Sequence, residues 1–406
     1  MSQIKPNTTV DLFFQLNWRS HDVTHTDSYS ARQVNLWRDI LPCRLKERLI
    51  GKHSGDSVHL SVSGSGLCDS EVRSDPIEIG QDQFAPLLGN SSSHRPRLGR
   101  FYPRGVLKDV TGIFRADRTP FRVVGRNNGR ITIDMNHPLA GSNPIDLSAT
   151  IGSIAAKPYE RGGALNHWGE IITEGVGMQA RRQDLLTHFF DDTPFARSDA
   201  SPDQNFYAKP RLVQHLDDMA IDVVRQIYAR FLRKGMRVLD LMSSWQSHLP
   251  DDFELRQLSG LGLNATELAK NPRLSDHIVH DLNQIPSLPY ADASYDLVVC
   301  TVSVEYLVRP FEVFAEVARV LRPGGVFATV FSNRWFPTKA VRIWTELHEF
   351  ERMGLVLEYF RNTHLFNDLH TYSIRGLARP IDDKYIGQTP YSDPVYAVWG
   401  SRALRS

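Results

Sequence analysis

Residues 236–333 decide the fold of this chain. They contain MRVLDLMSSWQSHLP (236–250), LSGLGLNATELAKN (258–271), IVHDLNQIPSLPYADASYDLVVCTVSVEYL (278–307) and VFAEVARVLRPGGVFATVFSN (313–333). Apolar runs of strand length alternate with helix-like segments, which favours βαβ units and a parallel sheet covered on both faces. Ligands bind at the carboxyl ends of the strands in such sheets, so the polar residues at strand ends are the candidates for chemistry.

Length and composition narrow the class of protein. The chain has 406 residues, which predicts two domains, and its hydrophobic and charged fractions of 41% and 23% are ordinary for globular proteins. A formal net charge of +1 gives no electrostatic reason to expect a nucleic-acid or acidic-membrane partner. Cys43, Cys68 and Cys300 are scattered, which favours a reducing compartment and argues against a zinc site. No apolar run is long enough to span a bilayer, so we expect a cytoplasmic protein. We also expect no bound metal.

The N-terminal part has mostly β-type patterns. Asn127-Asn128-Gly129 is a turn signal between two short apolar runs and predicts a hairpin. Pro42 and Gly51 suit the first turn and the C-terminal cap of a helix. The expected elements are strands over Val10–Trp18 and Gly55–Val62, a helix over Leu41–Lys52, and the hairpin of Phe121–Val124 with Ile131–Met135.

The run from Ile131 to Ile154, with DMNHPLAG at 134–141, resembles the return segment of SlyD-type FKBP proline isomerases. This resemblance implies a β-rich α+β domain over residues 1–155 with a flap inserted at about residues 75–130. The chain departs from that family where the prolyl bond would be held, for example at Phe13-Phe14 and at Gly64–Leu67. Two alternatives stay open: a working proline isomerase, or a module that binds peptides or associates with itself.

Residues 156–204 are predicted to be a connecting segment, because their composition is mixed. A helical pattern then opens at Asn205 and continues to Phe231. Phe206, Tyr207 and Arg211 would either close over a ligand or pack this helix onto the sheet.

Residues 205–406 resemble class I S-adenosylmethionine-dependent methyltransferases of the UbiE-like kind (methyltransferase type 11). The match is clearest over Leu288–Thr329, where Pro323-Gly324-Gly325 forms a turn that needs positive φ. The resemblance implies an α/β Rossmann-like domain with a mostly parallel seven-stranded sheet, and S-adenosylmethionine as the cofactor.

The same resemblance implies the cofactor residues. Asp240 ends the first strand, and Ser243, Ser244 and Trp245 replace the family's glycine-rich loop. The small serines are expected to cap a following helix and bind a carboxylate there, while Trp245 narrows the pocket. Further along the chain, the expected cofactor residues are Gly262 and Asn264 after the second strand, Asp281 and Leu282 beside the adenine, and Thr301 and Ser303 after the fourth strand.

Several of these positions have alternatives. Gly262 stands where the family has an acidic residue for the ribose; Asn264 would contact the ribose, cap the next helix, or do both. Glu305 and Tyr306 are the candidates for positioning the acceptor, with Glu305 as a base. Tyr207, Arg211, Asn333 and Arg334 are the candidates for substrate contacts. Asn333, Arg334 and Lys339 would together hold an anionic acceptor. The alternative is that the three residues only form local pairs.

The sequence therefore predicts an enzyme that transfers a methyl group from S-adenosylmethionine to a small-molecule acceptor, with a small thiol as one candidate because a thiolate needs little help with deprotonation. The alternative is a folding helper or scaffold in which both domains have lost their chemistry. The glycine-free loop favours the scaffold, whereas Asp281 and Asn264 favour the enzyme.

Overall fold

The computed structural model describes residues 3–68, 75–85, 95–142, 144–156, 165–182 and 185–404. The chain splits into two compact units: Met1–His21, Asp27–Asp192 and His348–Gly354 form the first, and Asp22–Thr26, Thr193–Leu347 and Leu355–Ser406 form the second. The predicted boundaries near residues 155 and 205 stay predictions. Residues 86–94 of the predicted flap, and residues 157–164 and 183–184 of the predicted connecting segment, lie outside the described ranges.

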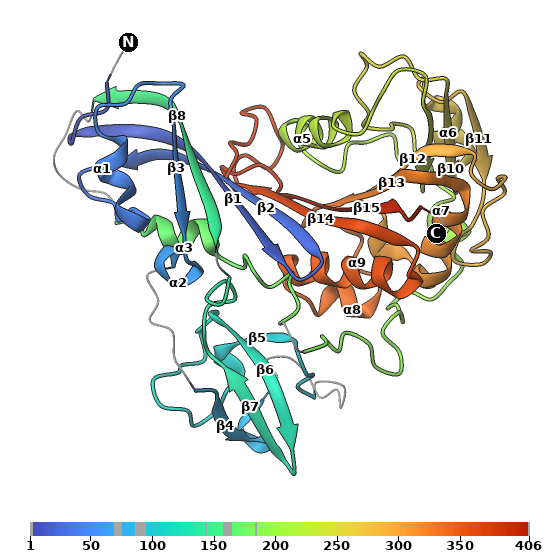
Figure 1. Cartoon of the computed structure of the whole chain (residues 1–406). Coiled ribbons are helices and arrows are strands. Elements are labelled where there is room, and N and C mark those ends of the chain that lie inside the picture. The colour runs from blue at the N-terminus through green and yellow to red at the C-terminus, as the bar shows by residue number, and fades with distance from the viewer. Residues whose placement is uncertain are drawn as a thin grey trace. The chain divides into compact units, whose positions relative to one another are not determined.

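Two sheets build the first unit. The larger has the strand order β2-β1-β8-β3, and the smaller, which the chain forms between β3 and β8, has the order β4-β7-β6-β5 (Figure 1). The elements are β1 (Thr8–Ser20), β2 (Val23–Asn35), η1 (Pro42–Arg44), α1 (Leu45–Leu49), β3 (Ser57–Val62), α2 (Gly64–Leu67), β4 (Ile77–Gly80), η2 (Gln81–Gln83), β5 (Phe101–Pro103), η3 (Arg104–Val106), β6 (Pro120–Asn127), β7 (Arg130–Asp134), β8 (Ile145–Ala156) and α3 (Trp168–Thr173).

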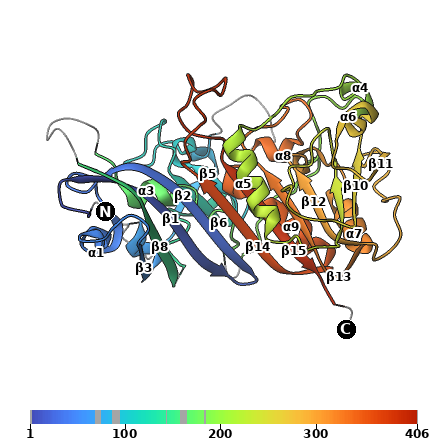
Figure 2. The same ribbon diagram turned by 90° about the horizontal axis from the view of Figure 1, so that it is seen from above.

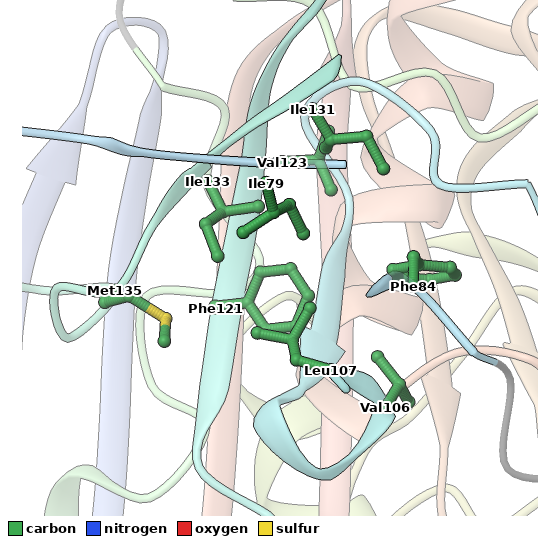
Figure 3. Close-up of a cluster of buried hydrophobic side chains, with 9 residues drawn as sticks. All are labelled: Ile79, Phe84, Val106, Leu107, Phe121, Val123, Ile131, Ile133 and Met135. Carbon is green, nitrogen blue, oxygen red and sulfur yellow. The ribbon is translucent and has the colours of Figure 1, made fainter. Parts of the chain in front are cut away.

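Local sequence patterns account for these strands. β1 buries every second residue from Thr8 to Trp18, the period-2 pattern of a half-buried strand. In the β6–β7 hairpin, Asn128 and Gly129 have φ of 46° and 77°, the two left-handed residues that a type I′ turn requires. The smaller sheet has its own apolar core around the fully buried Phe121 (Figure 3). Its resemblance to a SlyD-type flap stays a prediction.

The helix predicted over Leu41–Lys52 is broken. Cys43 and Arg44 adopt left-handed backbone angles, with φ of 54° and 55°, so the short turn η1 is separated from α1. Gly51 has φ of 86° and follows the end of α1, which fits its predicted place at the C-terminal cap.

The second unit contains the stretch quoted first. Its elements are α4 (Asp203–Phe206), α5 (Asp218–Ala229), β9 (Arg237–Leu241), β10 (Gln257–Gly262), α6 (Ala265–Lys270), β11 (Asp276–Val279), β12 (Tyr295–Thr301), η4 (Val304–Tyr306), α7 (Pro310–Val320), β13 (Leu321–Phe331), α8 (Arg342–Thr345), α9 (Glu349–Thr363), β14 (Phe366–Arg375) and β15 (Val395–Arg402). Residues Glu349–Gly354 of α9 belong to the first unit.

The sheet of the second unit has the strand order β11-β10-β9-β12-β13-β15-β14. β11, β10, β9, β12 and β13 are parallel, and β15 is antiparallel to both β13 and β14. Helix α5 covers one face and helices α8 and α9 cover the other (Figures 1 and 2). The predicted mostly parallel, doubly covered sheet is thus confirmed. The predicted number of seven strands is not shown, because Asp22–Thr26 also belong to this unit.

The prediction of a single helix from Asn205 to Phe231 is also wrong. The region contains α4 and α5, with residues 207–217 between them in a non-helical conformation. Pro210 lacks a backbone N–H and disfavours a helical conformation at the residue before it. Asp217 then caps α5 by accepting a hydrogen bond from the backbone N of Ala220. This break leaves the 207–217 segment free to line a cleft.

Candidate active site

A cleft opens at the carboxyl ends of β9, β10 and β12, where the parallel sheet predicts a ligand site. It holds about 1190 Å³ of space, part of which is open to solvent, and this is enough for a nucleoside-sized ligand. The structure brings most predicted site residues to its wall: Tyr207, Arg211, Asp240, Ser243, Ser244, Trp245, Gly262, Asn264, Asp281, Leu282, Thr301, Ser303 and Tyr306.

Three predicted site residues are not on this wall. Glu305 is 1% exposed in η4, so its burial argues against the predicted role as a base in the cleft. Arg334 donates from Nε to Asp393 at 3.0 Å and covers the ring of Tyr385. Asn333 accepts a hydrogen bond from Ser332. The structure therefore favours local pairing of Arg334 over contact with a substrate.

Lys339 is also a structural residue. Its side chain is fully buried, and its Nζ lies 3.0 Å from a carboxylate oxygen of Asp199 and 3.3 Å from one of Asp203. Nζ also donates to the carbonyl oxygen of Ser201 at 2.8 Å. These contacts hold the residues before α4 against the loop that follows β13.

The loop after β9 has a conformation that the serines did not predict. The next element along the chain is β10, so Ser243 and Ser244 cap no helix. The hydroxyl of Ser243 donates to Asp240 at 2.6 Å, and the hydroxyl of Ser244 donates to Glu267 at 2.6 Å. Met242 has φ of 59°, a left-handed angle that glycine adopts without strain. The backbone of the loop therefore has a conformation that glycine favours, and hydrogen bonds from the two hydroxyls to Asp240 and Glu267 hold it in place.

Gly262 is required by this loop. A Cβ atom at Gly262 would lie 2.2 Å from the carbonyl oxygen of Ser243, far inside van der Waals contact. The same approach lets the backbone N of Ser243 donate to the carbonyl of Leu261 at 2.7 Å. An acidic side chain is thus excluded at the position where the resembled family has one. The carboxylate of Glu267 lines the same cleft and is buried at the start of α6.

Asn264 caps α6, as one of its two predicted roles. Its Oδ1 accepts from the backbone N of Glu267 at 3.0 Å. Its Nδ2 donates to the carbonyl oxygens of Tyr207 at 2.7 Å and Ala208 at 3.2 Å. Asn264 therefore ties the 207–217 segment to the second strand end, and a contact with a ribose stays a prediction.

The 207–217 segment is fastened to the cleft at further points. The indole of Trp245 donates to the carbonyl of Val213 at 3.4 Å, and the amides of Gln214 and Gln246 are hydrogen-bonded to each other. The backbone N of Arg211 donates to Glu267 at 2.6 Å. Trp245 therefore supports this segment as well as narrowing the cleft.

Asp281 lies on the wall after β11. Its Oδ1 accepts from the backbone N atoms of Asn283 and Gln284, and its Oδ2 accepts from the side chain of Gln284 at 2.9 Å. The carboxylate thus stabilises its own turn, and any contact with an adenine would be additional.

We expect Asp281→Ala to weaken S-adenosylmethionine binding by about 1–3 kcal/mol, because a buried hydrogen-bond acceptor is removed. Asp281→Asn is the matched control, since it keeps an oxygen that accepts from the backbone of the turn, and loses the charge and the acceptor for the side chain of Gln284. Calorimetric titration of both variants measures the effect. Unchanged affinity in Asp281→Ala would remove this residue from the cofactor site.

Asp240 is the most perturbed acid of the cleft. Burial raises the pKa of its carboxyl group from 3.8 to about 7, although hydrogen bonds from Ser243 and Ser247 act in the opposite direction. The folded protein therefore retains a proton that the unfolded chain releases at about pH 4. Between about pH 4 and 7 the folded state binds more protons, so the free energy of unfolding falls as pH rises.

We expect this fall to amount to roughly 2–4 kcal/mol between pH 4 and 7, and to be absent in Asp240→Asn, which cannot titrate. Urea unfolding of both proteins at several pH values in this range measures it. An equal dependence on pH in both proteins would show that Asp240 is not the group responsible.

Backbone strain marks the end of β12. Val302 has φ of 41°, which is a rare angle for a β-branched residue. Such strained residues persist where the surrounding structure enforces them, and they cluster at functional sites. Ser303 donates to the carbonyl of Thr301 at 2.9 Å, and the hydroxyl of Tyr306 accepts from the backbone N of Phe336 at 2.9 Å. Tyr306 thereby holds the loop after β13 beside the cleft.

The cleft also contains functional candidates that the sequence analysis missed. They are Asp203, His215, His248, Glu267, Asn283 and Phe336. Glu267 had a local signal, since it stands three residues after the capping Asn264. His215 lies in the non-helical 207–217 segment, where a helix was predicted, and His248 lies in a loop without a periodic pattern. The Nδ1 atom of His248 is buried and has no hydrogen-bond partner among the described residues, so it is able to form a hydrogen bond with a ligand or a water molecule.

Comparisons with known proteins concern the second unit of the chain. Residues 258–329 match the family described as "Methyltransferase domain". No curated protein matches the chain. Among solved structures, the chain is similar to a protein of Haloferax volcanii described as a methyltransferase and solved with the Trm112 methyltransferase activator (19% identity, 46% of this chain, 92% of that chain, TM-score 0.37). It is also similar to a protein of Bacillus halodurans C-125 described as a methyltransferase (12% identity, 46% of this chain, 100% of that chain, TM-score 0.33).

Residues 258–329 therefore belong to a methyltransferase domain, and the cofactor of this domain is S-adenosylmethionine. Within the described residues, no helix combines the length and apolarity needed to cross a membrane. The same residues contain no group of three or more His, Cys, Asp or Glu side chains arranged to hold a metal ion.

Proposed function

We propose that this protein transfers the methyl group of S-adenosylmethionine to a small-molecule acceptor that enters the cleft beside Tyr306 and Phe336. The single observation that supports this most is the cleft itself, which gathers polar residues from the carboxyl ends of β9, β10 and β12. When bound, the cofactor supplies an electrophilic methyl group on a sulfonium. The polar wall, with the carboxylates of Glu267 and Asp281, suits a cationic nucleoside ligand.

The chain's own residues would position the acceptor and receive its proton. His215 lines the cleft, and its ring packs edge-on against Phe336 at 5.3 Å. Burial, and then the positive charge of Arg211, lower the pKa of His215, so its imidazole is neutral at neutral pH and able to accept a proton. We therefore assign the role of base to His215 in place of Glu305, and positioning to Tyr306.

The aromatic wall and the enclosed position favour a small acceptor over a macromolecule. The net charge of +1 gives no reason to propose a nucleic-acid or membrane partner. Small thiols are the first class to screen, because a thiolate needs little assistance in losing its proton. A cytoplasmic location is part of this proposal, since thiols stay reduced there.

The test is methyl transfer from S-adenosylmethionine, labelled on the methyl group, to a panel of small thiols, amines and carboxylic acids. We expect labelled product with one class, and a loss of at least tenfold in its rate for His215→Ala at neutral pH, with partial recovery at higher pH. Product formation that is equally fast in His215→Ala would contradict the role of this histidine. No transfer to any member of the panel, despite cofactor binding, would contradict the proposed class of acceptor.

A further inference from the structure

The guanidinium of Arg211 is the most unusual charged group of the cleft. Its Nη2 donates to the carbonyl oxygen of Phe206 at 2.9 Å. Its Nη1 is buried and has no hydrogen-bond partner among the residues that the structure describes. The residue is half-buried, and within the same described residues no carboxylate forms an ion pair with its side chain. A cation that is partly removed from water is normally compensated by an opposite charge.

The surrounding charged groups already have partners. Arg197 donates twice to Asp203, at 2.7 and 2.9 Å. Lys339 pairs with Asp199 and Asp203, as described above. The carboxylate of Glu267 accepts from the backbone N of Arg211 and from the hydroxyl of Ser244, but not from the guanidinium. Arg211 is therefore the cation that remains uncompensated at this end of the cleft.

Three aromatic rings hold this guanidinium in place. Its central carbon lies 4.5 Å from the ring centre of Phe206, 5.3 Å from that of Phe336 and 5.6 Å from that of Tyr207. The rings stabilise the cation and fix its plane without using its N–H groups. A planar N–H fork of this kind matches the two oxygens of a carboxylate.

We propose that Arg211 binds a carboxylate group of a ligand that occupies this cleft. The inference rests on the proposed function in one respect, namely that the cleft takes S-adenosylmethionine and an acceptor. Two ligands can provide the carboxylate: the methionine part of the cofactor, or an acceptor whose apolar part lies among Phe206, Tyr207 and Phe336. The binding chemistry is the same for both.

Two matched ligand pairs distinguish these sources. The first pair is S-adenosylhomocysteine and its decarboxylated counterpart, 5′-deoxy-5′-(3-aminopropylthio)adenosine, which differ only in the carboxylate. The second pair is phenylacetate and phenylacetamide, added to protein saturated with S-adenosylhomocysteine. Calorimetric titration of the full chain gives the four dissociation constants.

We expect the unaltered protein to prefer the carboxylate member of at least one pair by about tenfold to a hundredfold, as charge-assisted hydrogen bonds do. Arg211→Met removes the charge, keeps most of the volume, and should abolish that preference. Arg211→Lys keeps the charge without the fork and should reduce the preference, so it carries the test if Arg211→Met does not fold. Arg309→Met, at an exposed pair with Glu312, is the control and should leave the preference unchanged.

The pKa of His215 provides a second test, because a purely structural role of Arg211 would not change it when a carboxylate ligand binds. Because the charge of Arg211 lowers the pKa of His215, a bound carboxylate that neutralises Arg211 should raise that pKa. Titration of the His215 ring followed by NMR should show this rise with the carboxylate member of the preferred pair and not with the neutral member.

The possible outcomes separate the two claims. A preference in the first pair that depends on Arg211 supports binding of the cofactor carboxylate, and one in the second pair supports binding of an acceptor carboxylate. Equal affinities within both pairs, or a preference that persists in Arg211→Met, would overturn the proposal for Arg211. Failure of the unaltered protein to bind S-adenosylhomocysteine at all would instead overturn the proposed function.

Discussion

Gly262→Asp is expected to weaken S-adenosylmethionine binding by about 100-fold or more, which corresponds to about 2.7 kcal/mol. The resembled family has an acidic residue at this place, so the substitution restores a family feature and would strengthen binding if the strand end followed the family. In this chain, however, a Cβ atom at Gly262 would lie 2.2 Å from the carbonyl oxygen of Ser243. The new side chain must push away the loop that carries Ser243, Ser244 and Trp245.

The damage should extend beyond one contact. Displacement of Ser243 breaks its backbone hydrogen bond to Leu261 and removes the hydroxyl that solvates the buried carboxyl group of Asp240. Calorimetric titration measures the loss of affinity. Gly387→Asp is the matched control, because nothing lies within 4 Å of a Cβ atom at that glycine. Binding in Gly262→Asp that equals or exceeds that of the unaltered protein would show that the loop is not held as described.

Lys339→Met is expected to lower the free energy of unfolding by about 3–5 kcal/mol, because it removes the cation from a buried group of partners. Lys339 is fully buried, and Asp203 beside it is only 3% exposed. Methionine has a similar length, so the change tests the charge and its hydrogen bonds more than the packing. Urea unfolding followed by circular dichroism measures the difference.

Lys209→Met serves as the control for the same chemical change at an exposed position. It should alter stability by no more than about 0.5 kcal/mol. A loss below about 1 kcal/mol in Lys339→Met would mean that Lys339 is not needed to compensate Asp203. Lys339 was predicted as a ligand for an anionic acceptor, but it pairs with Asp199 and Asp203. We propose Arg211 for the anionic group instead.

The sequence predicted the second unit's sheet well because its signals are local. β9, β10, β12 and β13 are apolar runs that a parallel sheet buries on both faces. Gly324 has φ of 78°, the positive angle predicted for the Pro323-Gly324-Gly325 turn. The wall of the cleft followed from the same reasoning, since residues at the carboxyl ends of neighbouring parallel strands meet at one edge.

The errors occurred where long-range contacts decide the conformation. The apolar residues of 207–217 fit a helical period, but Pro210 and the capping Asp217 divide the helix, and bonds from Asn264 and Trp245 fix the segment instead. The close approach of Ser243 to Gly262 joins residues 19 positions apart and leaves no local pattern. Arg334 and Glu305 were predicted as site residues from their place after a strand. Arg334 pairs with Asp393 and Glu305 is buried, and neither feature could be read from the local sequence.

The N-terminal unit shows a different limit. Its strands and the β6–β7 hairpin followed from alternation and from Asn128-Gly129, but those signals describe elements and not a function. The DMNHPLAG segment suggested a SlyD-type module, and both alternatives, a working proline isomerase and a module that binds peptides or associates with itself, remain predictions. A cis–trans isomerisation assay with a prolyl peptide would test the first alternative independently of the methyltransferase domain.

Calorimetric titration of the full chain with S-adenosylmethionine tests the central claim most directly. The claim is that a glycine-free loop, held by the hydroxyls of Ser243 and Ser244, forms a working cofactor site. The account predicts one site per chain with micromolar affinity, and much weaker binding in Gly262→Asp. Absence of binding at millimolar S-adenosylmethionine would contradict it, and would mean that the cleft no longer takes the cofactor of its family.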